Sequence, residues 1–492
     1  MTFNSPEFLL FYPIVCALYF LLPKKLKWPM LLLASYFFYM YYQAELVFLI
    51  LGTTLVSFFA SRIIEKTDKV KIKRACLTVT LIVCFGVLFF YKYFNFLSGS
   101  VTGLIALFGG VPTAFELNLI LPVGISFYTF QTLSYVIDVY RGKVRCEDNF
   151  FFYALYVSFF PQLVAGPIER PGNLIPQLKE SHAPTKDNFI KGAKHMIVGF
   201  FKKICVADLI SVYVNAVYNS SDSADGLGIV IATVLFAVQI YCDFSGYTDI
   251  AIGCAKIMGI DLMQNFNMPY TARSIKEFWS RWHISLSSWF RDYVYIPLGG
   301  NRCSSFRQSY NVFIVFLLSG IWHGANWTFV LWGILHGVYQ IVGKVTMGLR
   351  KKLCARLHLN RQSRGYAIWE TVCTFLLVTF AWIFFRANNL SDLGTLLSKL
   401  FTGWGGANYL GTSLDILQIG AAEIVIVILA IIIMNLLDLL IMQNKDRVCF
   451  NSYDAQVGVR DNSYLYLLMC IAVSWLILLA GNGASSFIYF QF

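Results

Sequence analysis

The chain has 492 residues, of which 57% are hydrophobic and only 13% are charged. Soluble domains carry about 25% charged residues, so this composition excludes an ordinary soluble protein and predicts an integral membrane protein. The formal net charge of +12 would also suit a nucleic-acid-binding protein. The basic residues lie at the flanks of apolar runs and not in one soluble domain, however, which excludes that class of partner.

Ten apolar runs follow one another along the chain, and we expect about 11 transmembrane helices in an all-α, multi-pass fold. The runs cover residues 8–22, 29–43, 46–63, 75–97, 119–140, 228–242, 310–343, 370–385, 421–441 and 463–480. Some runs are short for a straight span and are expected to be tilted, kinked or re-entrant. We treat residues 1–492 as one membrane domain, with N-terminal helices (1–145), a central catalytic region (146–345) and C-terminal helices (346–492).

Clusters of basic residues indicate how the chain is oriented in the membrane. They lie at 24–27, 66–74 and 141–145, and all three fall on one side if the spans alternate. By the positive-inside rule this side is the cytoplasm, so the N-terminus is predicted to be extracytoplasmic. The basic stretch at 344–364 is assigned to the cytoplasm as well.

Pro, Gly, Ser and Asp interrupt the hydrophobic runs at 122–127, 161–167 and 241–247. Broken helices at membrane depth are tolerated only where protein or a water-filled cavity satisfies the freed backbone groups. The sequence therefore predicts a central cavity lined by these three segments.

Residues 275–294 have the periodicity of an amphipathic helix at the membrane interface. His283 lies on its apolar side, so this side chain is expected to point into the protein. The arginines between 273 and 307 have two interpretations: interfacial charges that snorkel to water, or a joint site for an anionic ligand, because Arg forks match phosphate. Arg281 and Arg291 are the candidates for such a site.

The run 310–343 contains two similar frames, Gly-Ile-Trp-His-Gly at 320–324 and Gly-Ile-Leu-His-Gly at 333–337. If the run were one straight helix, His323 and His336 would lie 13 residues and roughly 20 Å apart, too far to act on one atom. The paired glycines also suit close helix packing. Structural hydrogen bonding is therefore the interpretation for His336.

His323 is the candidate general base, because a neutral imidazole with polar neighbours can accept a proton near pH 7. In a continuous helix Asn326 would share its face. The alternative is that His323, too, is a structural residue. The 12 cysteines include no Cys-x-x-Cys pair, so no metal site is expected.

Several long strings in the chain resemble the membrane-bound O-acyltransferase family, and within it the bacterial alginate O-acetyltransferase branch. The resemblance covers nearly the whole chain. The strings are Glu277–Ser287, Trp289–Tyr293, Ile296–Arg302, Ser319–Ala325, Pro122–Gln131, Phe160–Glu169, Asp243–Tyr247 and Phe384–Ala387. His323 lies at the position of the family's invariant histidine, and His283 lies at that of its second histidine.

The resemblance implies a ring of membrane helices around a thinned core with amphipathic or re-entrant helices, in a bacterial plasma (inner) membrane surrounded by lipids. It implies an O-acyltransferase, specifically an acetyltransferase, with acetyl-CoA as the donor substrate and no bound cofactor. The acetyl group would reach an extracytoplasmic polysaccharide, with an SGNH-type acetyltransferase or another polymer-modifying partner outside. Trp282, Trp322 and Asn326 are the expected substrate-binding residues beside the histidines, together with Arg281 and Arg291.

The last residues, Phe487 to Phe492, resemble the C-terminal Phe-x-Tyr-x-x-Phe peptide of the small partner in teichoic-acid D-alanylation. By that resemblance Tyr489 would accept the acyl group in cis, whereas the simpler interpretation is an interfacial aromatic anchor. Two alternatives to polysaccharide acetylation stay open. They are D-alanyl transfer onto teichoic acid and a transporter that carries out no acyl chemistry.

Overall fold

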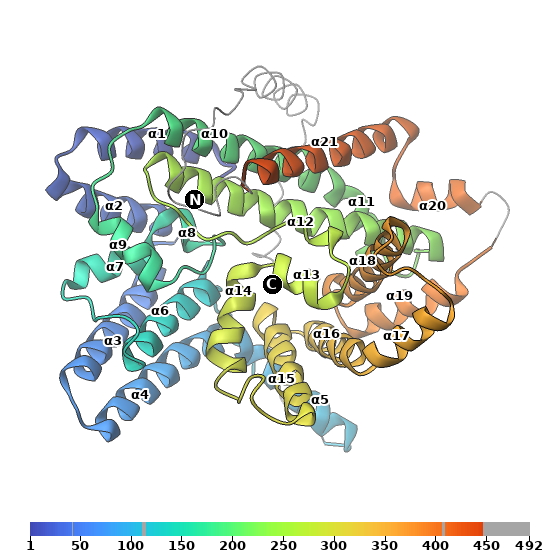
Figure 1. Ribbon diagram of the computed structural model, residues 1–492, viewed down its shortest axis with the longest axis horizontal. Coiled ribbons are helices and arrows are strands. Elements are labelled where there is room, and N and C mark those ends of the chain that lie inside the picture. The colour runs from blue at the N-terminus through green and yellow to red at the C-terminus, as the bar shows by residue number, and fades with distance from the viewer. Residues whose placement is uncertain (42, 111–114, 406–408, 446–492) are drawn as a thin grey trace. The chain divides into compact units, whose positions relative to one another are not determined.

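The computed structural model describes residues 1–41, 43–110, 115–405 and 409–445, and throughout these ranges the chain is helical without a β-strand (Figure 1). This confirms the all-α prediction. The described residues form two compact units. The first comprises residues 1–196, 250–264 and 288–294, and the second comprises 197–249, 265–287 and the described residues from 295 onward.

The elements of the first unit are helices, with η for short 3₁₀ or π-helical segments. They are α1 (Pro6–Leu21), α2 (Lys24–Met40), η1 (Ala44–Leu46), α3 (Val47–Lys66), α4 (Val70–Leu88), η2 (Phe89–Tyr93), α5 (Phe94–Leu107), α6 (Ile125–Tyr140), α7 (Phe150–Ser158), α8 (Phe160–Leu163) and α9 (Pro171–Lys179). Elements that belong partly to each unit are α10 (Lys186–Phe200), α12 (Gly226–Ile257), α14 (Ile284–Phe290) and η5 (Arg291–Tyr295).

The second unit contains the remaining elements of the described chain. They are η3 (Phe201–Asp208), α11 (Leu209–Tyr218), η4 (Pro269–Thr271), α13 (Ile275–Arg281), α15 (Ser305–His323), α16 (Trp327–Val345), α17 (Met347–Arg356), α18 (Arg364–Arg386), α19 (Leu390–Thr402), α20 (Tyr409–Leu417) and α21 (Ala421–Lys445). Within this unit α15 packs on α16, α16 on α18, and α21 on η3.

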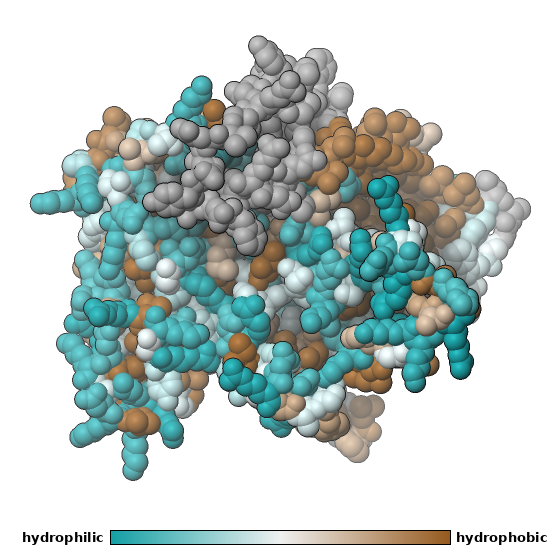
Figure 2. Space-filling model, in the orientation of Figure 1, coloured by the Kyte–Doolittle hydropathy of each residue, from teal (hydrophilic) through white to brown (hydrophobic). Residues whose placement is uncertain are grey.

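Five of the described helical segments are long and apolar enough to cross a membrane: 44–66, 70–107, 226–257, 364–386 and 421–439. The total of 11 spans stays a prediction. Helix α21 shows a lipid-compatible pattern, because aliphatic side chains such as Val425, Leu429 and Leu436 are each more than half exposed. Figure 2 shows brown, hydrophobic side chains gathered over α21. Water would not favour such a surface, whereas lipid tails would.

Two of the three predicted interruptions are confirmed, and both lie in the first unit. Helix α6 begins only at Ile125, after Gly124 with φ 76°, and α8 ends at Leu163. A Cβ on Gly124 would lie 2.5 Å from the Leu163 carbonyl oxygen, so the two segments pack backbone to backbone. The third prediction is wrong, because α12 runs unbroken through 241–247. The predicted cavity stays a prediction.

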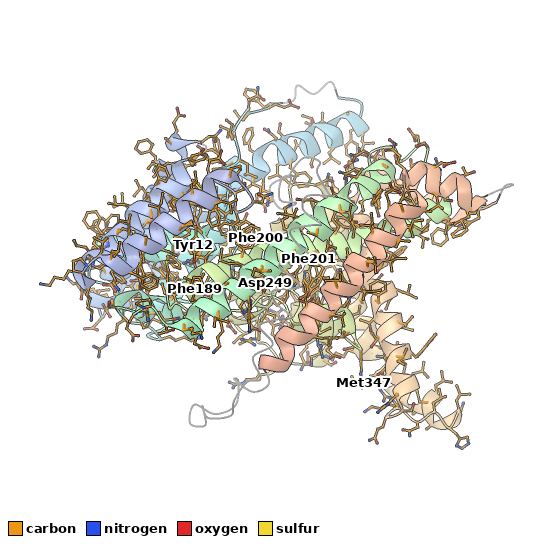
Figure 3. The ribbon with its side chains drawn as sticks, turned by 90° about the horizontal axis from the view of Figure 1, so that it is seen from above. Tyr12, Phe189, Phe200, Phe201, Asp249 and Met347 are labelled. Atoms are coloured by element: carbon orange, nitrogen blue, oxygen red, sulfur yellow. The ribbon has the colours of Figure 1, made fainter. Side chains whose placement is uncertain are left out.

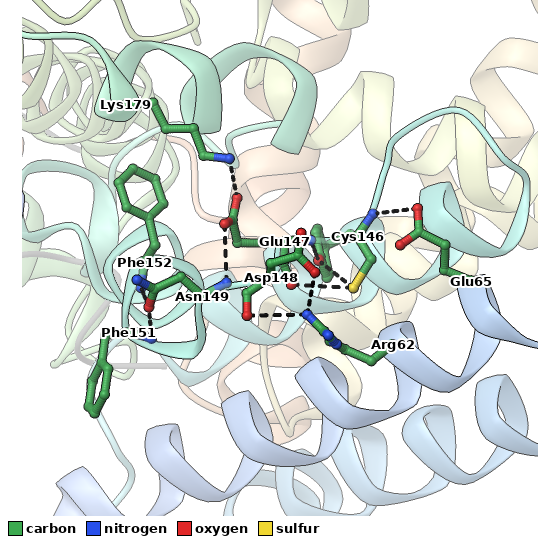
Figure 4. Close-up of polar contacts among 10 residues, drawn as sticks. Arg62, Glu65, Cys146, Glu147, Asp148, Asn149, Phe151, Phe152 and Lys179 are labelled. Atoms are coloured by element: carbon green, nitrogen blue, oxygen red, sulfur yellow. Dashed lines mark hydrogen bonds and ion pairs between the residues drawn. The ribbon is translucent and has the colours of Figure 1, made fainter.

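Polar contacts in the first unit fix the loop that precedes α7 (Figure 4). The Cys146 N–H donates to Glu65 of α3 at 3.1 Å, and Lys179 of α9 pairs with Glu147 at 2.6 Å. Asn149 caps α7 by accepting a hydrogen bond from the Phe151 N–H at 2.9 Å. A loop between apolar helices thus satisfies its backbone donors with side chains from its neighbours.

The second unit contains a buried network of ion pairs between η3, α12 and α21. Lys202 lies 2.8 Å from Asp249 and 2.6 Å from Asp438, and Lys203 lies 2.6 Å from Asp243. Figure 3 labels Asp249 on α12 and Phe201 at the first residue of η3. Because ions are costly to bury without partners, these contacts hold the three elements together.

Candidate active site

A helical hairpin in the second unit places His323. Helix α15 ends at this residue, Gly324 is extended, and α16 begins at Trp327. The assumption of one straight helix over 310–343 is therefore wrong, because the chain reverses direction at 324–326. His323 is consequently the last residue of its helix, and only 3% of it is exposed.

The repeated glycines explain how the hairpin closes. Gly320 and Gly333 face each other, and a Cβ on either would lie 2.4 Å from a carbonyl oxygen of the opposite helix, that of Phe329 or Phe316. No side chain fits at that spacing. The interpretation of the repeated frame as a helix-packing device is confirmed, and the two helices concerned are α15 and α16 themselves.

His283 lies beside His323 in the second unit. The predicted helix over 275–294 is interrupted here, since α13 ends at Arg281 and α14 begins at Ile284. His283 is fully buried, as expected. It does not lie on the face of a continuous helix, however; it lies between two helices and has a backbone φ of 45°. The centroids of the His283 and His323 rings are 6.5 Å apart.

Aromatic side chains enclose the two histidines. The ring of Trp322 lies 5.9 Å from that of His283 and 5.0 Å from that of His323, measured between centroids. Trp332 and Phe385 lie 5.0 and 5.3 Å from His323. Burial among such groups disfavours the charged imidazolium, and it lowers the pKa of His283 to about 3. His283 is therefore neutral near pH 7, with one ring nitrogen that donates and one that accepts.

His336 is closer to His323 than the straight-helix assumption placed it. The ring of Trp332 contacts both, at 5.0 Å from His323 and 4.9 Å from His336. The Nε1–H of Trp279 donates to His336 Nδ1 at 3.2 Å. This bond gives His336 the hydrogen-bonded structural position that its sequence context suggested.

The other predicted site residues lie in different places relative to the two histidines. Trp282 is buried beside His283 and stacks on Phe278 at 5.5 Å. Asn326 does not share a helical face with His323; it caps α16 and donates to the Asn388 carbonyl at 2.7 Å. The expectation of a shared face was wrong because the helix ends before Asn326.

The two predicted arginines form ion pairs within the chain. Arg281 pairs with Glu277 at 2.7 Å and donates to Thr271 at 2.9 Å. Arg291 belongs to the first unit, where it pairs with Asp292 at 2.8 Å. Tyr489 lies outside the described residues, so its predicted role stays a prediction.

Sequence patterns did not identify one neighbour of the histidines, the segment around Asn265. Asn265 is fully buried and accepts hydrogen bonds from the residues that follow His283. The signal available was weak: an Asn in an otherwise irregular stretch, 18 residues before His283. Phe244, whose ring lies 4.6 Å from that of His283, belongs to the noted 243–247 string.

Comparison with known proteins identifies the family of the chain. Residues 145–387, which include both histidines, match the model of the membrane-bound O-acyltransferase family. The probable alginate O-acetylase AlgI of Pseudomonas aeruginosa is 37% identical, over 87% of this chain and 81% of its own length. The peptidoglycan O-acetyltransferase of Helicobacter pylori is 34% identical, over 86% and 83%.

A third relative is named for the transfer of a different acyl group, D-alanyl. The teichoic acid D-alanyltransferase of Bacillus subtilis is 30% identical, over 54% of this chain and 69% of its own length. The family match and the extent of the first two alignments confirm the resemblance seen in the sequence. The chain is an O-acyltransferase of the membrane and belongs to the membrane-bound O-acyltransferase family.

Proposed function

We propose that this enzyme transfers acetyl groups from cytoplasmic acetyl-CoA toward an extracytoplasmic polysaccharide, with His323 as the general base. The observation that carries the proposal is the pairing of two buried histidines, His283 and His323, in one aromatic enclosure. Relatives that act on alginate and peptidoglycan by name support a polysaccharide acceptor and an acetyl donor.

The chemistry needs one proton carrier and one group that stabilises negative charge. A hydroxyl oxygen of the acceptor attacks the thioester carbonyl while His323 takes the hydroxyl proton. The tetrahedral intermediate then collapses, the carbon–sulfur bond breaks, and the imidazolium returns the proton to the leaving thiolate. The products are an O-acetyl ester and CoA thiol, with no net proton released.

His283 is suited to the second task. It is neutral at working pH, because burial lowers the pKa of its ring, so it can donate one hydrogen bond to the oxygen of the tetrahedral intermediate. At a centroid separation of 6.5 Å the two imidazoles can reach opposite sides of a small acyl carbonyl. Trp322 contacts both rings and is assigned the substrate-binding role in this arrangement.

Replacing His323 by Ala tests the proposal. The expected result is a loss of polymer acetylation of about 10²- to 10⁴-fold, the usual contribution of a general base, at normal membrane levels of the protein. The matched control is His336→Ala, which removes the histidine of the second glycine frame and should keep most acetylation per folded molecule. Full acetylation by the His323→Ala variant would rule out the mechanism.

The C-terminal tail could carry the acetyl group in a relay. Tyr489 would attack the thioester, and its phenol, with an ordinary pKa near 10, needs less help from a base than an alkyl alcohol does. The aryl ester would pass the acetyl group to an SGNH-type partner outside. Mass spectrometry of protein trapped without acceptor should find acetyl-Tyr489, and an active Tyr489→Phe variant would exclude the relay.

We also propose that the N-terminus is extracytoplasmic and that acetyl-CoA reaches the site from the cytoplasm. The basic clusters at 24–27, 66–74 and 141–145 support this orientation. Labelling of an N-terminal tag by an impermeant reagent in intact spheroplasts should succeed. Labelling only after lysis would reverse the assignment.

D-alanyl transfer is the second candidate, supported by the Bacillus subtilis relative. It requires a carrier-protein thioester in place of CoA. The test measures release of CoA thiol from acetyl-CoA by purified enzyme in nanodiscs. Release that requires an intact His323 would favour acetyl transfer. Strict dependence on a D-alanyl carrier protein would favour the alternative. Family membership favours either acyl chemistry over a transporter.

A further inference from the structure

His283 has a backbone conformation that its own side chain disfavours. Its φ of 45° lies in the left-handed region, which residues with a Cβ rarely adopt. Such positions persist where the surrounding structure holds them, and they gather at functional sites. The residues that hold His283 in this conformation therefore control where its ring points.

One extended segment holds the chain on both sides of His283. The backbone N–H of Asn267 donates to the Arg281 carbonyl at 2.9 Å, and the backbone carbonyl of Asn265 accepts from the Ile284 N–H, also at 2.9 Å. These bonds fix the residue that ends α13 and the residue that begins α14. His283 lies between the two fixed points, where the chain has to turn.

The side chain of Asn265 adds further bonds on the C-terminal side. Its Oδ1 accepts from the Ser285 N–H at 3.2 Å and from the Ser285 hydroxyl at 2.6 Å. Its Nδ2 lies 3.4 Å from the Thr248 hydroxyl of α12. Asn265, Ser285 and Thr248 are at most 2% exposed, so water cannot replace these bonds if one partner is removed.

We propose that Asn265 is a positioning residue for acyl transfer, which acts by holding His283 in the left-handed conformation that turns its ring toward His323. This inference rests on the proposed function, because His283 is assumed to act in the reaction. Without the Asn265 side chain the Ser285 N–H and hydroxyl lose their acceptor, and only the backbone carbonyl of Asn265 still holds the start of α14. His283 can then relax to an ordinary backbone conformation, which moves its ring away from Phe244 and His323.

The test compares two equivalent substitutions in the same segment. Asn265→Leu removes the buried acceptor at nearly constant volume. Asn267→Leu is the matched control. The side chain of Asn267 is exposed, and its hydrogen bond to the Arg281 carbonyl comes from the backbone N–H, which the substitution keeps. Native membranes that contain each full-length variant are supplied with labelled acetyl-CoA, and label incorporated into polymer gives apparent kcat and KM for acetyl-CoA.

We expect Asn265→Leu to lower apparent kcat by about 10- to 100-fold, the range seen when supporting residues of a site are removed, with KM changed by less than about twofold. Asn267→Leu should resemble the wild type. Asn265→Asp keeps an acceptor oxygen in place and should recover part of the lost rate. A merely structural role would lower the amount of folded protein and leave kcat per folded molecule unchanged.

A double-mutant comparison with His283→Ala tests the route of the effect. If Asn265 acts through His283, Asn265→Leu should cause no further loss of kcat in the His283→Ala background. An additional loss of the same size there would overturn the inference. Should Asn265→Leu fail to fold, Ser285→Ala removes only the 2.6 Å bond and should lower kcat in the same direction by a smaller factor; an unchanged kcat would overturn the inference.

Failure of the proposed function gives a different result. In that case wild-type membranes incorporate no label from acetyl-CoA into polymer. If the wild type transfers acetyl groups and His283→Ala is fully active, the role of His283 fails. If His283→Ala is inactive but Asn265→Leu has wild-type kcat, only the positioning role of Asn265 is wrong.

Discussion

Two groups of buried polar side chains in the second unit are accommodated in opposite ways. His283 and His323 are packed among aromatic rings, and burial lowers the pKa of His283. Lys202 and Lys203 are equally buried, but each lies between two carboxylates at 2.6 to 2.8 Å. The charge of each lysine is neutralised by carboxylates of the protein. A neutral imidazole, in contrast, can still exchange a proton with a substrate.

Under the proposed function, this difference separates the groups that take part in the reaction from those that stabilise the fold. A lysine fixed by two carboxylates is a poor proton carrier, since its charged form is held in place. A neutral imidazole among rings keeps both proton-donating and proton-accepting capacity. The ion network is therefore expected to affect folding, and the histidine pair is expected to affect the rate.

The largest effect on stability is expected from Lys202→Met. The change removes a buried cation and leaves Asp249 and Asp438 without it, which should cost about 3–5 kcal/mol of unfolding free energy. Thermal unfolding in detergent measures this loss. Lys191→Met is the control, because Lys191 forms an exposed pair with Asp187 that is worth at most about 1 kcal/mol.

The assignment of the ion network to stability is contradicted if Lys202→Met unfolds like the wild type and yet abolishes acetyl transfer. That outcome would place the ion network in the reaction. Normal transfer per folded molecule, together with reduced stability, would keep the network in its structural role.

A smaller effect is expected from Gly333→Ala in the hairpin that places His323. The new Cβ would lie 2.4 Å from the Phe316 carbonyl oxygen, so α15 and α16 must separate, at about 1–3 kcal/mol. Thermal unfolding and acetyl transfer should both decline. Gly343→Ala, in the same helix with open space around it, should be neutral or stabilising by about 1 kcal/mol. Equal behaviour of the two variants would show that the close packing is unimportant.

The pH dependence of stability gives a third measurement. Burial lowers the pKa of His283 to about 3, below the ordinary value near 6.5. Between these values the unfolded chain binds a proton that the folded chain does not, so stability is complete above pH 6.5 and falls as the pH decreases. The expected contribution is about 1.4 kcal/mol per pH unit.

The His283→Gln variant isolates this contribution, since all other titrating groups are shared. Its unfolding temperature should decrease less than that of the wild type between pH 6.5 and 5. Parallel curves for the two proteins would indicate that His283 takes up its proton in the folded state, and the neutral-imidazole role would then fail.

The smallest effect on stability is expected from Arg281→Ala, which removes a partly exposed pair with Glu277. The loss should be at most about 1 kcal/mol. Acetyl transfer decides whether Arg281 has a second role: an increased KM for acetyl-CoA with unchanged kcat would support binding of the anionic donor. Unchanged kinetics would leave Arg281 with only its ion pair.

Short-range sequence patterns predicted the all-α membrane fold and the family, and they named His283 and His323, whose ring centroids lie 6.5 Å apart in the structure. Apolar runs gave an all-α membrane protein, the strings around His283 and His323 gave the family, and Pro and Gly marked the interruption at 122–127. These features depend on residues near one another in the chain. The same patterns gave wrong helix boundaries in three places. Helix α12 continues through 241–247, whereas helices end within 275–294 and 310–343. Periodicity does not specify where a helix continues, stops or reverses.

The sequence by itself determined the membrane class and the family, and it singled out His283 and His323 as candidate site residues. Tertiary structure decided that Gly320 meets Gly333, that α15 ends at His323, and that Asn265 accepts hydrogen bonds from the two residues after His283. These contacts join residues that are 13 to 20 positions apart, and they depend on side-chain volume and on buried hydrogen bonds. Local periodicity carries information about neither, so only the folded chain shows which histidines meet.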